Sequence, residues 1–323
     1  MVNLRRPTYT DVLKARKVIA PYLDKTPLRH YPLLSEVLGF EAYVKHENLL
    51  PTSSFKIRGG INLISQLSLE ERERGVITAS TGNHGQSIAL AAKMFGVKAI
   101  ICAPEGSNPD KMNVIRSFGA ETVEEGRDFE EARLNAERIS EEKGMRYIHS
   151  GNEPLLIAGV GTAGLEILED LPDLDAVIAP VGGGSTASGL SIVFKTVAPE
   201  VKVIGVQSEA APSVYLSWKS GRIESTKSAD TFADGLATRR AFEFTTPILR
   251  DNLDDFILVS EEELKAAIRL YVEKAHTIAE GAGAAALAAG YKIRERFKGK
   301  KVVLMLSGAN ITAEMLKGIL SEG

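Results

Sequence analysis

One lysine in this sequence stands where an amine could do covalent chemistry. Lys56 lies within residues 51–60, between the aromatic Phe55 and a segment ending in two glycines, just after a Pro-Thr-Ser turn signal. A lysine amine can form a Schiff base with a carbonyl compound and can act as a general base. Most lysines are simply solvated at the surface, so this stretch alone does not distinguish a catalytic amine from an ordinary one.

A glycine-rich loop is the second feature suited to chemistry. Between a predicted strand at 176–181 and a predicted helix at 186–197 lie Gly182, Gly183, Gly184, Ser185 and Thr186. Glycines let backbone N–H groups approach a phosphate, and a helix N-terminus attracts its negative charge. Three successive glycines are costly in chain entropy unless such an approach is needed, so we predict an anion-binding loop. The loop also fits the pattern G-x-G-x-x-A, with Glu209 after the next strand, which leaves a NAD-dependent dehydrogenase as an alternative.

Polar loops after two other predicted strands could also hold a ligand. The loop that follows strand 76–79 contains Ser80, Thr81, Gly82, Asn83 and His84. Its hydroxyls, amide and exposed N–H groups could bind a carboxylate, although Ser80 or Thr81 could equally be a helix N-cap. After strand 301–306, the hydroxyl of Ser307 could bond a ring nitrogen or could serve as a cap.

Strand and helix patterns alternate along most of the chain. Strands are predicted at 41–45, 76–79, 97–102, 121–123, 147–149, 176–181, 201–206, 256–259 and 301–306. Between them, helices are predicted at 59–66, 86–95, 108–118, 128–143, 157–168, 186–197 and 264–276. This alternation indicates an α/β fold with two doubly wound, mostly parallel sheets. Ligand sites in such sheets lie at the carboxyl ends of strands, where all these polar loops occur.

Two runs of the alternation suggest two domains. We expect a small domain at 73–150 and a large domain formed by residues 1–72 together with 151–323. The length of 323 residues agrees with this division, because single hydrophobic cores stop growing near ~250–300 residues.

Composition excludes several classes of function. The chain is 44% hydrophobic and 25% charged, with a net charge of −3, so it has no electrostatic footprint for nucleic acid or an anionic membrane. No apolar run approaches the ~18–20 residues of a membrane span, and no secretory signal is present, so we expect a cytoplasmic protein. Cys102 is the only cysteine and the five histidines are scattered, which argues against a disulfide framework or a zinc site.

Taken in order, these motifs resemble the serine/threonine dehydratase group of the fold-type-II pyridoxal-phosphate enzymes, which includes serine racemase. The matching segments are 54–59 (the motif S-F-K-x-R-G), 80–86 (the asparagine loop), 182–189 (the phosphate loop) and 307–310 (the S-G-G-N segment). Shorter matches lie at 158–162, 233–235 and 279–284. The resemblance covers nearly the whole chain. It implies a tryptophan-synthase-β-like fold whose small domain is mobile and carries the asparagine loop.

The resemblance also implies roles for individual residues. Lys56 would bind the aldehyde of pyridoxal 5'-phosphate and later remove the substrate α-proton, while Phe55 would pack near the ring. Asn83 would bond the ring hydroxyl, and Ser307 would face the ring nitrogen. The residues implied to hold the rest of the cofactor are Gly182, Gly183, Gly184, Ser185, Thr186 and Gly235. Those implied to receive the substrate carboxylate are Ser80, Thr81, Gly82, Asn83 and His84.

The reaction implied is α,β-elimination from L-threonine or L-serine, which gives a 2-oxo acid and ammonia. The implied partners are a small amino acid and further copies of the chain in a dimer or tetramer. Thr81 is a second catalytic candidate, because serine racemases carry a serine acid there, and racemisation is therefore an alternative. Threonine synthase or another β-replacement enzyme is a further alternative, although Ile57 stands where those families usually have an aspartate or asparagine.

The chain departs from the family pattern at several positions. Ser185 and Ala309 replace glycines, and Val160 replaces a glutamine. Gln207 and Ser213 stand where related enzymes use a glutamate and an aspartate to hold a divalent cation. Without those carboxylates a hard cation loses most of its attraction, so we expect no metal dependence. We also expect no C-terminal regulatory domain after the last motif.

Overall fold

The computed structural model describes residues 4–322, whose strands form two separate sheets. The larger, six-stranded sheet consists, in spatial order, of β1 (Leu28–His30), β2 (Glu41–His46), β10 (Lys301–Leu306), β7 (Ala176–Pro180), β8 (Lys202–Ser208) and β9 (Asp255–Val259). The smaller, four-stranded sheet consists of β5 (Glu121–Glu124), β4 (Ala99–Ala103), β3 (Val76–Ala79) and β6 (Arg146–Tyr147). Only β1 and β2 pair antiparallel; every other pairing in the two sheets is parallel. The predicted α/β class with mostly parallel sheets is confirmed.

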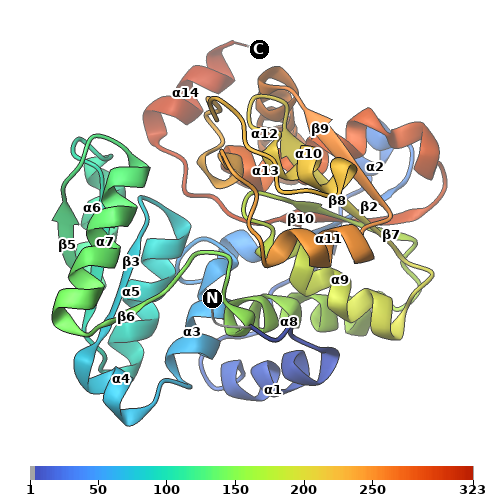
Figure 1. The fold of residues 1–323 in the computed structure, drawn as a ribbon. Coiled ribbons are helices and arrows are strands. Elements are labelled where there is room, and N and C mark those ends of the chain that lie inside the picture. The colour runs from blue at the N-terminus through green and yellow to red at the C-terminus, as the bar shows by residue number, and fades with distance from the viewer. Residues whose placement is uncertain (1–3, 323) are drawn as a thin grey trace.

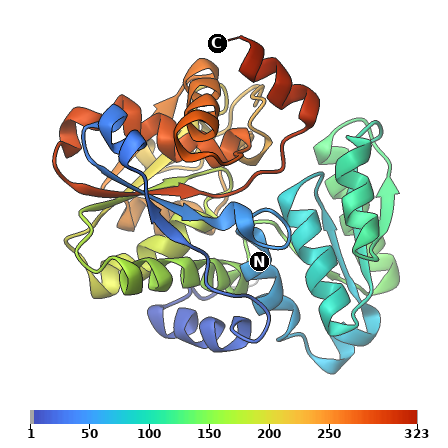
Figure 2. The same cartoon turned by 180° about the vertical axis from the view of Figure 1, so that it is seen from behind.

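Helices cover both sheets, and Figures 1 and 2 show the smaller sheet and its helices beside the larger body. The helices of the first half are α1 (Tyr9–Ile19), α2 (Pro32–Leu38), α3 (Lys56–Ile64), α4 (Leu69–Arg74), α5 (Asn83–Phe95), α6 (Pro109–Ser117) and α7 (Phe129–Lys143). Those of the second half are α8 (Pro154–Asp170), α9 (Ser185–Val197), α10 (Ser213–Ser220), α11 (Thr245–Asn252), α12 (Glu261–Ala275), α13 (Gly281–Lys292) and α14 (Ala313–Ser321). Short 3-10 turns are η1 (Glu47–Leu49), η2 (Asp234–Leu236) and η3 (Arg294–Phe297). No helix within 4–322 combines the length and apolar character needed to cross a membrane.

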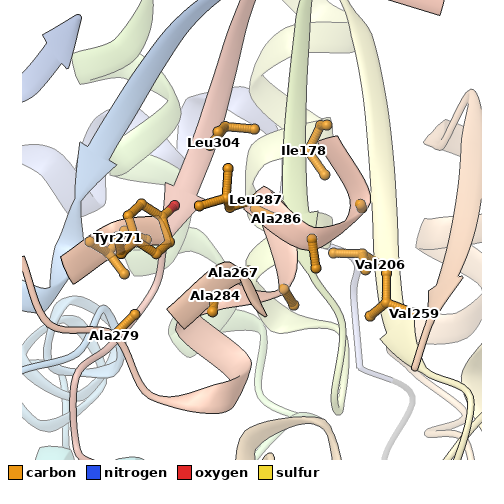
Figure 3. Packing of buried hydrophobic residues seen from close by; sticks show 14 of the residues in the cluster. Ile178, Val206, Val259, Ala267, Tyr271, Ala279, Ala284, Ala286, Leu287 and Leu304 are labelled. Carbon is orange, nitrogen blue, oxygen red and sulfur yellow. The ribbon is translucent and has the colours of Figure 1, made fainter. Parts of the chain in front are cut away.

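Helix α13 forms the centre of the largest hydrophobic core. Figure 3 shows Ala286 and Leu287 of this helix on the side of Ile178 and Leu304 of the sheet, with Ala284 nearer Ala267 of α12. The helix is rich in alanine and glycine and is buried along most of its length, so it packs closely on the strands. Sequence patterns did not predict this helix, because it has no polar face and therefore no amphipathic period.

Several predicted boundaries were wrong, and two of the shifts concern the polar loops. Helix α3 begins at Lys56, not near residue 59, and α5 begins at Asn83, not near residue 86. The strand predicted at 147–149 ends at Tyr147, so His149 lies in the following loop. Lys56 and Asn83 are therefore the first residues of two helices.

Helix α3 crosses both α5 and α8 at glycine contacts, so it connects the two parts of the molecule. A Cβ on Gly159 of α8 would lie 2.6 Å from the carbonyl oxygen of Arg58 and 2.8 Å from the Cα of Gly59. A Cβ on Gly60 would collide with Ser87 of α5, whose hydroxyl donates to the carbonyl of Lys56 at 2.7 Å. Glycine is required at these positions because the helix backbones almost touch.

We predict that Gly159→Ala lowers the free energy of unfolding by about 1–3 kcal/mol, because the added methyl group meets backbone atoms that cannot move aside. Gly318→Ala on α14 is the control, since its added Cβ has no atom within 4 Å. There the better helix propensity of alanine should leave stability unchanged or raise it by up to about 1 kcal/mol. Denaturant unfolding of both variants measures this, and equal stabilities would contradict the crossing argument.

Candidate active site

The predicted lysine and glycine loop lie together at the carboxyl ends of the strands of the larger sheet. The Nζ of Lys56 donates to the hydroxyl of Ser185 at 3.1 Å and to the carbonyl of Ser150 at 3.3 Å. Ser185 is the first residue of α9 and follows β7, while Ser150 lies in the loop between β6 and α8. Three segments far apart in the sequence thus meet at one amine.

The amine of Lys56 has no counter-ion. Across residues 4–322, no carboxylate comes within salt-bridge distance of its Nζ, and the ring of Phe55 lies 5.2 Å away. Burial lowers the pKa of Lys56 to about 8, because desolvation disfavours the ammonium form. A far larger fraction of this amine than of an ordinary lysine is therefore neutral near physiological pH, and the neutral form is the one that attacks a carbonyl or takes a proton.

The glycine loop is suited to a phosphate. Gly184 has φ 90°, in the left-handed region, and precedes the first turn of α9. A Cβ on Gly182 would collide with the carbonyl of Gly235, and one on Gly183 would collide with the ring of Phe242. No backbone N–H of residues 182–186 donates to another group in the described part of the chain. These unused donors at a helix N-terminus fit the phosphate of the implied cofactor.

Ser307 follows the last residue of β10 and lies beside Ser54 and Phe55, the two residues that precede Lys56. The amide of Phe55 donates to the carbonyl of Ser307 at 3.0 Å, and Ser54 forms a β-bridge with Gly308. The hydroxyl of Ser307 is buried, and its only nearby acceptor in the described residues is the carbonyl of Ala282, at 3.5 Å. A weakly engaged neutral hydroxyl can still bond an acceptor such as a ring nitrogen.

Asn83 links the first turn of α5 to the larger part of the molecule through two residues that sequence reasoning missed. Its side-chain amide donates to Oε1 of Glu280 at 2.6 Å, and its carbonyl oxygen accepts from Nδ2 of Asn310, also at 2.6 Å. Burial raises the pKa of Glu280 to about 7. Glu280 and Asn310 lie in segments that were noted at 279–284 and 307–310, but nothing in the sequence alone pointed to their contact with Asn83.

The loop from Ser80 to His84 combines capping with unused donors. The hydroxyl of Ser80 accepts from the amides of Gly82 and Gly85 at 3.2 and 3.0 Å, so it supports the start of α5. The ring of His84 is buried, with Nε2 3.1 Å from the hydroxyl of Thr78, and desolvation lowers its pKa to about 3. The backbone amides of Thr81, Asn83 and His84 have no acceptor within the described chain and could bind a carboxylate.

Gln207 and Ser213, the two positions where related enzymes are expected to hold a divalent cation, carry neutral side chains. Oε1 of Gln207 accepts from the amide of Tyr215 at 3.0 Å, and the hydroxyl of Ser213 donates to the carbonyl of Thr238. Among residues 4–322, no group of three or more His, Cys, Asp or Glu side chains could hold a metal ion. Independence from metal ions remains a prediction.

Comparisons with known proteins agree on one family. Residues 19–308 match the family model described as "Pyridoxal-phosphate dependent enzyme". An L-threonine ammonia-lyase of Thermotoga maritima is 44% identical over 316 residues, which is 98% of this chain and 79% of that protein. The processed form of threonine deaminase isoform 2 from Solanum lycopersicum has a TM-score of 0.91 at 34% identity, covering 99% of this chain and 96% of that one. Maize serine racemase has a TM-score of 0.93 at 29% identity, covering 98% of both chains.

The raised pKa of Glu280 predicts a pH-dependent stability. In the unfolded chain this carboxyl ionises near its ordinary pKa of 4.5, whereas in the folded protein it ionises near 7. The folded state therefore loses stability relative to the unfolded state as pH rises from 4.5 through 7. In the cofactor-free protein, Glu280→Gln should gain about 1–3 kcal/mol relative to the parent between pH 5 and pH 8.

Denaturant unfolding at both pH values measures that gain. Glu295→Gln is the control, since its side chain is 83% exposed and its effect should not change between pH 5 and pH 8. A gain for Glu280→Gln that is the same at both pH values would show that the buried carboxyl titrates normally.

Proposed function

This chain belongs to the pyridoxal-phosphate-dependent enzyme family, and we propose that it is an L-threonine ammonia-lyase that also accepts L-serine. The reaction converts L-threonine to 2-oxobutanoate and ammonia. One water is eliminated from the α and β carbons, and one water is taken up when the eliminated product hydrolyses and releases ammonia. The observation that carries the proposal is the counter-ion-free amine of Lys56, whose Nζ lies 3.1 Å from the hydroxyl of Ser185 in the glycine loop. The cofactor is pyridoxal phosphate, so the dinucleotide alternative is not retained.

When bound, pyridoxal phosphate supplies a conjugated ring that accepts electrons from the substrate α-carbon. We assign Lys56 two tasks: its amine would hold the cofactor, and its Nζ would take the proton from the substrate α-carbon. The pKa of about 8 supports both tasks, because it keeps part of the amine neutral and able to accept a proton. The ring of Phe55, whose centre lies 5.2 Å from this amine, would shield one side of it from water.

The loop residues would orient the two anionic groups of the reactants. The free amides of residues 182–186 would bind the cofactor phosphate, and Gly235 would support this loop through its contact with Gly182. The amides of Thr81, Asn83 and His84 would bind the substrate carboxylate at the N-terminus of α5. Binding both anions at fixed helix ends would leave the α-carbon close to Lys56.

Ser307 would face the ring nitrogen of the cofactor. A serine hydroxyl, unlike a carboxylate, does not stabilise a positive charge on its partner. It would therefore keep the ring nitrogen unprotonated and limit electron build-up in the ring, which favours prompt loss of the β-hydroxyl. This supports elimination over reactions that need a long-lived carbanion.

We also propose that residues 73–150 move relative to the rest of the chain during turnover. This segment contains the four-stranded sheet, and it packs tightly on α3 where Gly60 meets Ser87. Away from that crossing it meets the larger part through polar contacts, among them Asn83 with Glu280 and Asn310, and Lys111 of α6 with Asp234 of η2. These polar contacts can break and re-form while the apolar packing between α3 and α5 stays intact, so α3 would act as the hinge side of the movement. The arrangement supports opening and closing over the amine, in a protein that we expect to be a dimer or tetramer.

The central experiment is Lys56→Ala on the purified holoenzyme. We expect the visible absorbance of the bound cofactor to vanish and the formation of 2-oxobutanoate from L-threonine to fall at least a thousandfold, because both the covalent link and the base are lost. Lys14→Ala on the exposed face of α1 is the matched control and should keep both properties. A parent protein that binds the cofactor but releases no 2-oxo acid would instead favour a replacement enzyme such as threonine synthase.

Racemisation of L-serine is the second candidate activity, since the fold is similar to that of maize serine racemase. Thr81 stands where racemases carry a serine, and its extra methyl group hinders delivery of a proton to the face opposite Lys56. We expect at least ten molecules of pyruvate for each D-serine, and Thr81→Ser should raise the D-serine share several-fold. Chiral chromatography together with a 2-oxo acid assay measures both products, and D-serine in excess of pyruvate would reverse the assignment.

A further inference from the structure

A buried charge cluster lies on the side of α3 away from the site. Its four side chains, which we call the buried quartet, are Lys45, Glu47, Arg58 and Glu166. They are only 0%, 0%, 1% and 10% exposed, in that order. Two cations and two anions make the quartet neutral overall, which is the condition under which charges can be buried.

Arg58 is the centre of the quartet. Its Nε and Nη2 donate to the two oxygens of Glu47 at 2.6 and 2.8 Å, while Nη1 and Nη2 donate to the two oxygens of Glu166 at 2.6 and 2.8 Å. Lys45 also donates to Glu166, at 2.6 Å. Such two-point contacts between a planar guanidinium and a carboxylate fix orientation as well as distance.

The remaining polar atoms around the quartet are used by two threonines. The hydroxyl of Thr26 donates to Glu47 at 2.7 Å, and the carbonyl of Thr26 accepts from Lys45 at 2.7 Å. The hydroxyl of Thr162 accepts from Arg58 at 3.2 Å. A network with this many contacts has few alternative arrangements, so it holds one geometry.

The quartet joins α3, the helix that carries Lys56, to three other elements. Lys45 is on β2, Glu47 is on η1, Arg58 is on α3 and Glu166 is on α8. Lys56 and Arg58 are two residues apart in the first turn of α3, and at about 100° per residue their side chains point to nearly opposite sides of the helix. A constraint on the Arg58 side of α3 therefore sets the rotation of the first turn, and with it the direction of the Lys56 side chain.

Stability alone does not account for a buried quartet. Apolar side chains of similar volume would fill the same space without desolvating four charges, and such replacements are often neutral or stabilising in proteins. What apolar packing does not provide is the directional two-point contact that fixes helix rotation. The close crossings at Gly59–Gly159 and Gly60–Ser87 select the faces of α3 that meet α8 and α5, and the quartet adds a directional contact in the first turn, where Lys56 lies.

We propose that Arg58, held by Glu47 and Glu166, is a positioning residue that orients the Nζ of Lys56 for its reaction. The proposal rests on the proposed function, because it assigns Lys56 the catalytic amine. None of the quartet is expected to touch the substrate or the cofactor.

The test compares Arg58→Lys with the parent as holoenzymes. Lysine keeps the charge but cannot make the two-point contacts with both carboxylates. Per bound cofactor, we expect kcat with L-threonine to fall at least tenfold, while KM changes less than threefold because the carboxylate-binding amides on α5 are untouched. We also expect the circular dichroism of the visible cofactor band, per bound cofactor, to change at least twofold, since that signal reports the orientation of the lysine-bound ring.

Asp254→Asn is the matched control. Asp254 accepts from Lys195, Lys202 and the amide of Val203 at 2.6, 3.1 and 2.8 Å, but it precedes β9 at the end of the sheet away from the site. This variant also loses ion pairs and should lose stability, yet its kcat and its circular dichroism per bound cofactor should equal those of the parent.

The outcomes separate a positioning role from a merely structural one. If Arg58→Lys lowers stability or cofactor content but leaves kcat and circular dichroism per bound cofactor unchanged, the proposal is wrong. If Arg58→Lys does not fold, Glu166→Gln is judged by the same two measurements and the same criteria. If the parent releases no 2-oxo acid, the proposed reaction fails, and the circular dichroism alone still decides whether the quartet orients Lys56.

Discussion

The structure depends on the close crossing of α3 by α5 and α8. At these crossings Gly60 meets Ser87, and Gly59 meets Gly159, so the helix backbones are separated by little more than van der Waals contact. The first residue of α3 is Lys56, and its carbonyl accepts a hydrogen bond from Ser87. The packing that joins the two sheets therefore also determines where the amine lies. Movement of one part relative to the other would act directly on the helix that carries the reactive group.

Much of the fold could be predicted because its signals are local. Short apolar strands followed by polar loops and helices appear within 10 to 20 residues of sequence, and the loops led correctly to the carboxyl ends of the strands. Helix α13 could not be predicted, because its alanines and glycines pack on all sides and leave no period. The starts of α3 and α5 were also misplaced. The polar residues just before the predicted starts of α3 and α5 were predicted to be loops, although in the structure they form the first helical turns.

The candidate site could be predicted only in part, for a different reason. The lysine and the glycine loop were found because each belongs to a contiguous motif. The contacts of Asn83 with Glu280, and of Arg58 with Glu166, join residues separated by 197 and 108 positions, and nothing in a single sequence marks such pairs. Ser185 shows the same limit. The sequence shows it as a replacement of a glycine, but the partner of its hydroxyl, the amine of Lys56, is known only from the fold.

The replacement of glycine by Ser185 is tolerated for a conformational reason that also bears on the chemistry. The left-handed residue of the loop is Gly184, with φ 90°, whereas Ser185 already has helical geometry as the first residue of α9. A side chain at 185 therefore introduces no backbone strain, and it contributes the hydroxyl that accepts from Lys56.

Helix α3 begins with Lys56 itself and α9 begins with Ser185, which accepts from its Nζ, and helix N-termini disfavour a positive charge and favour anions. Burial favours the neutral form of both Lys56 and Glu280. It lowers the pKa of the Lys56 amine and raises the pKa of the Glu280 carboxyl. The result is a site whose amine and carboxyl both change protonation close to neutral pH, beside helix ends whose free amides would suit the phosphate and carboxylate of the proposed ligands.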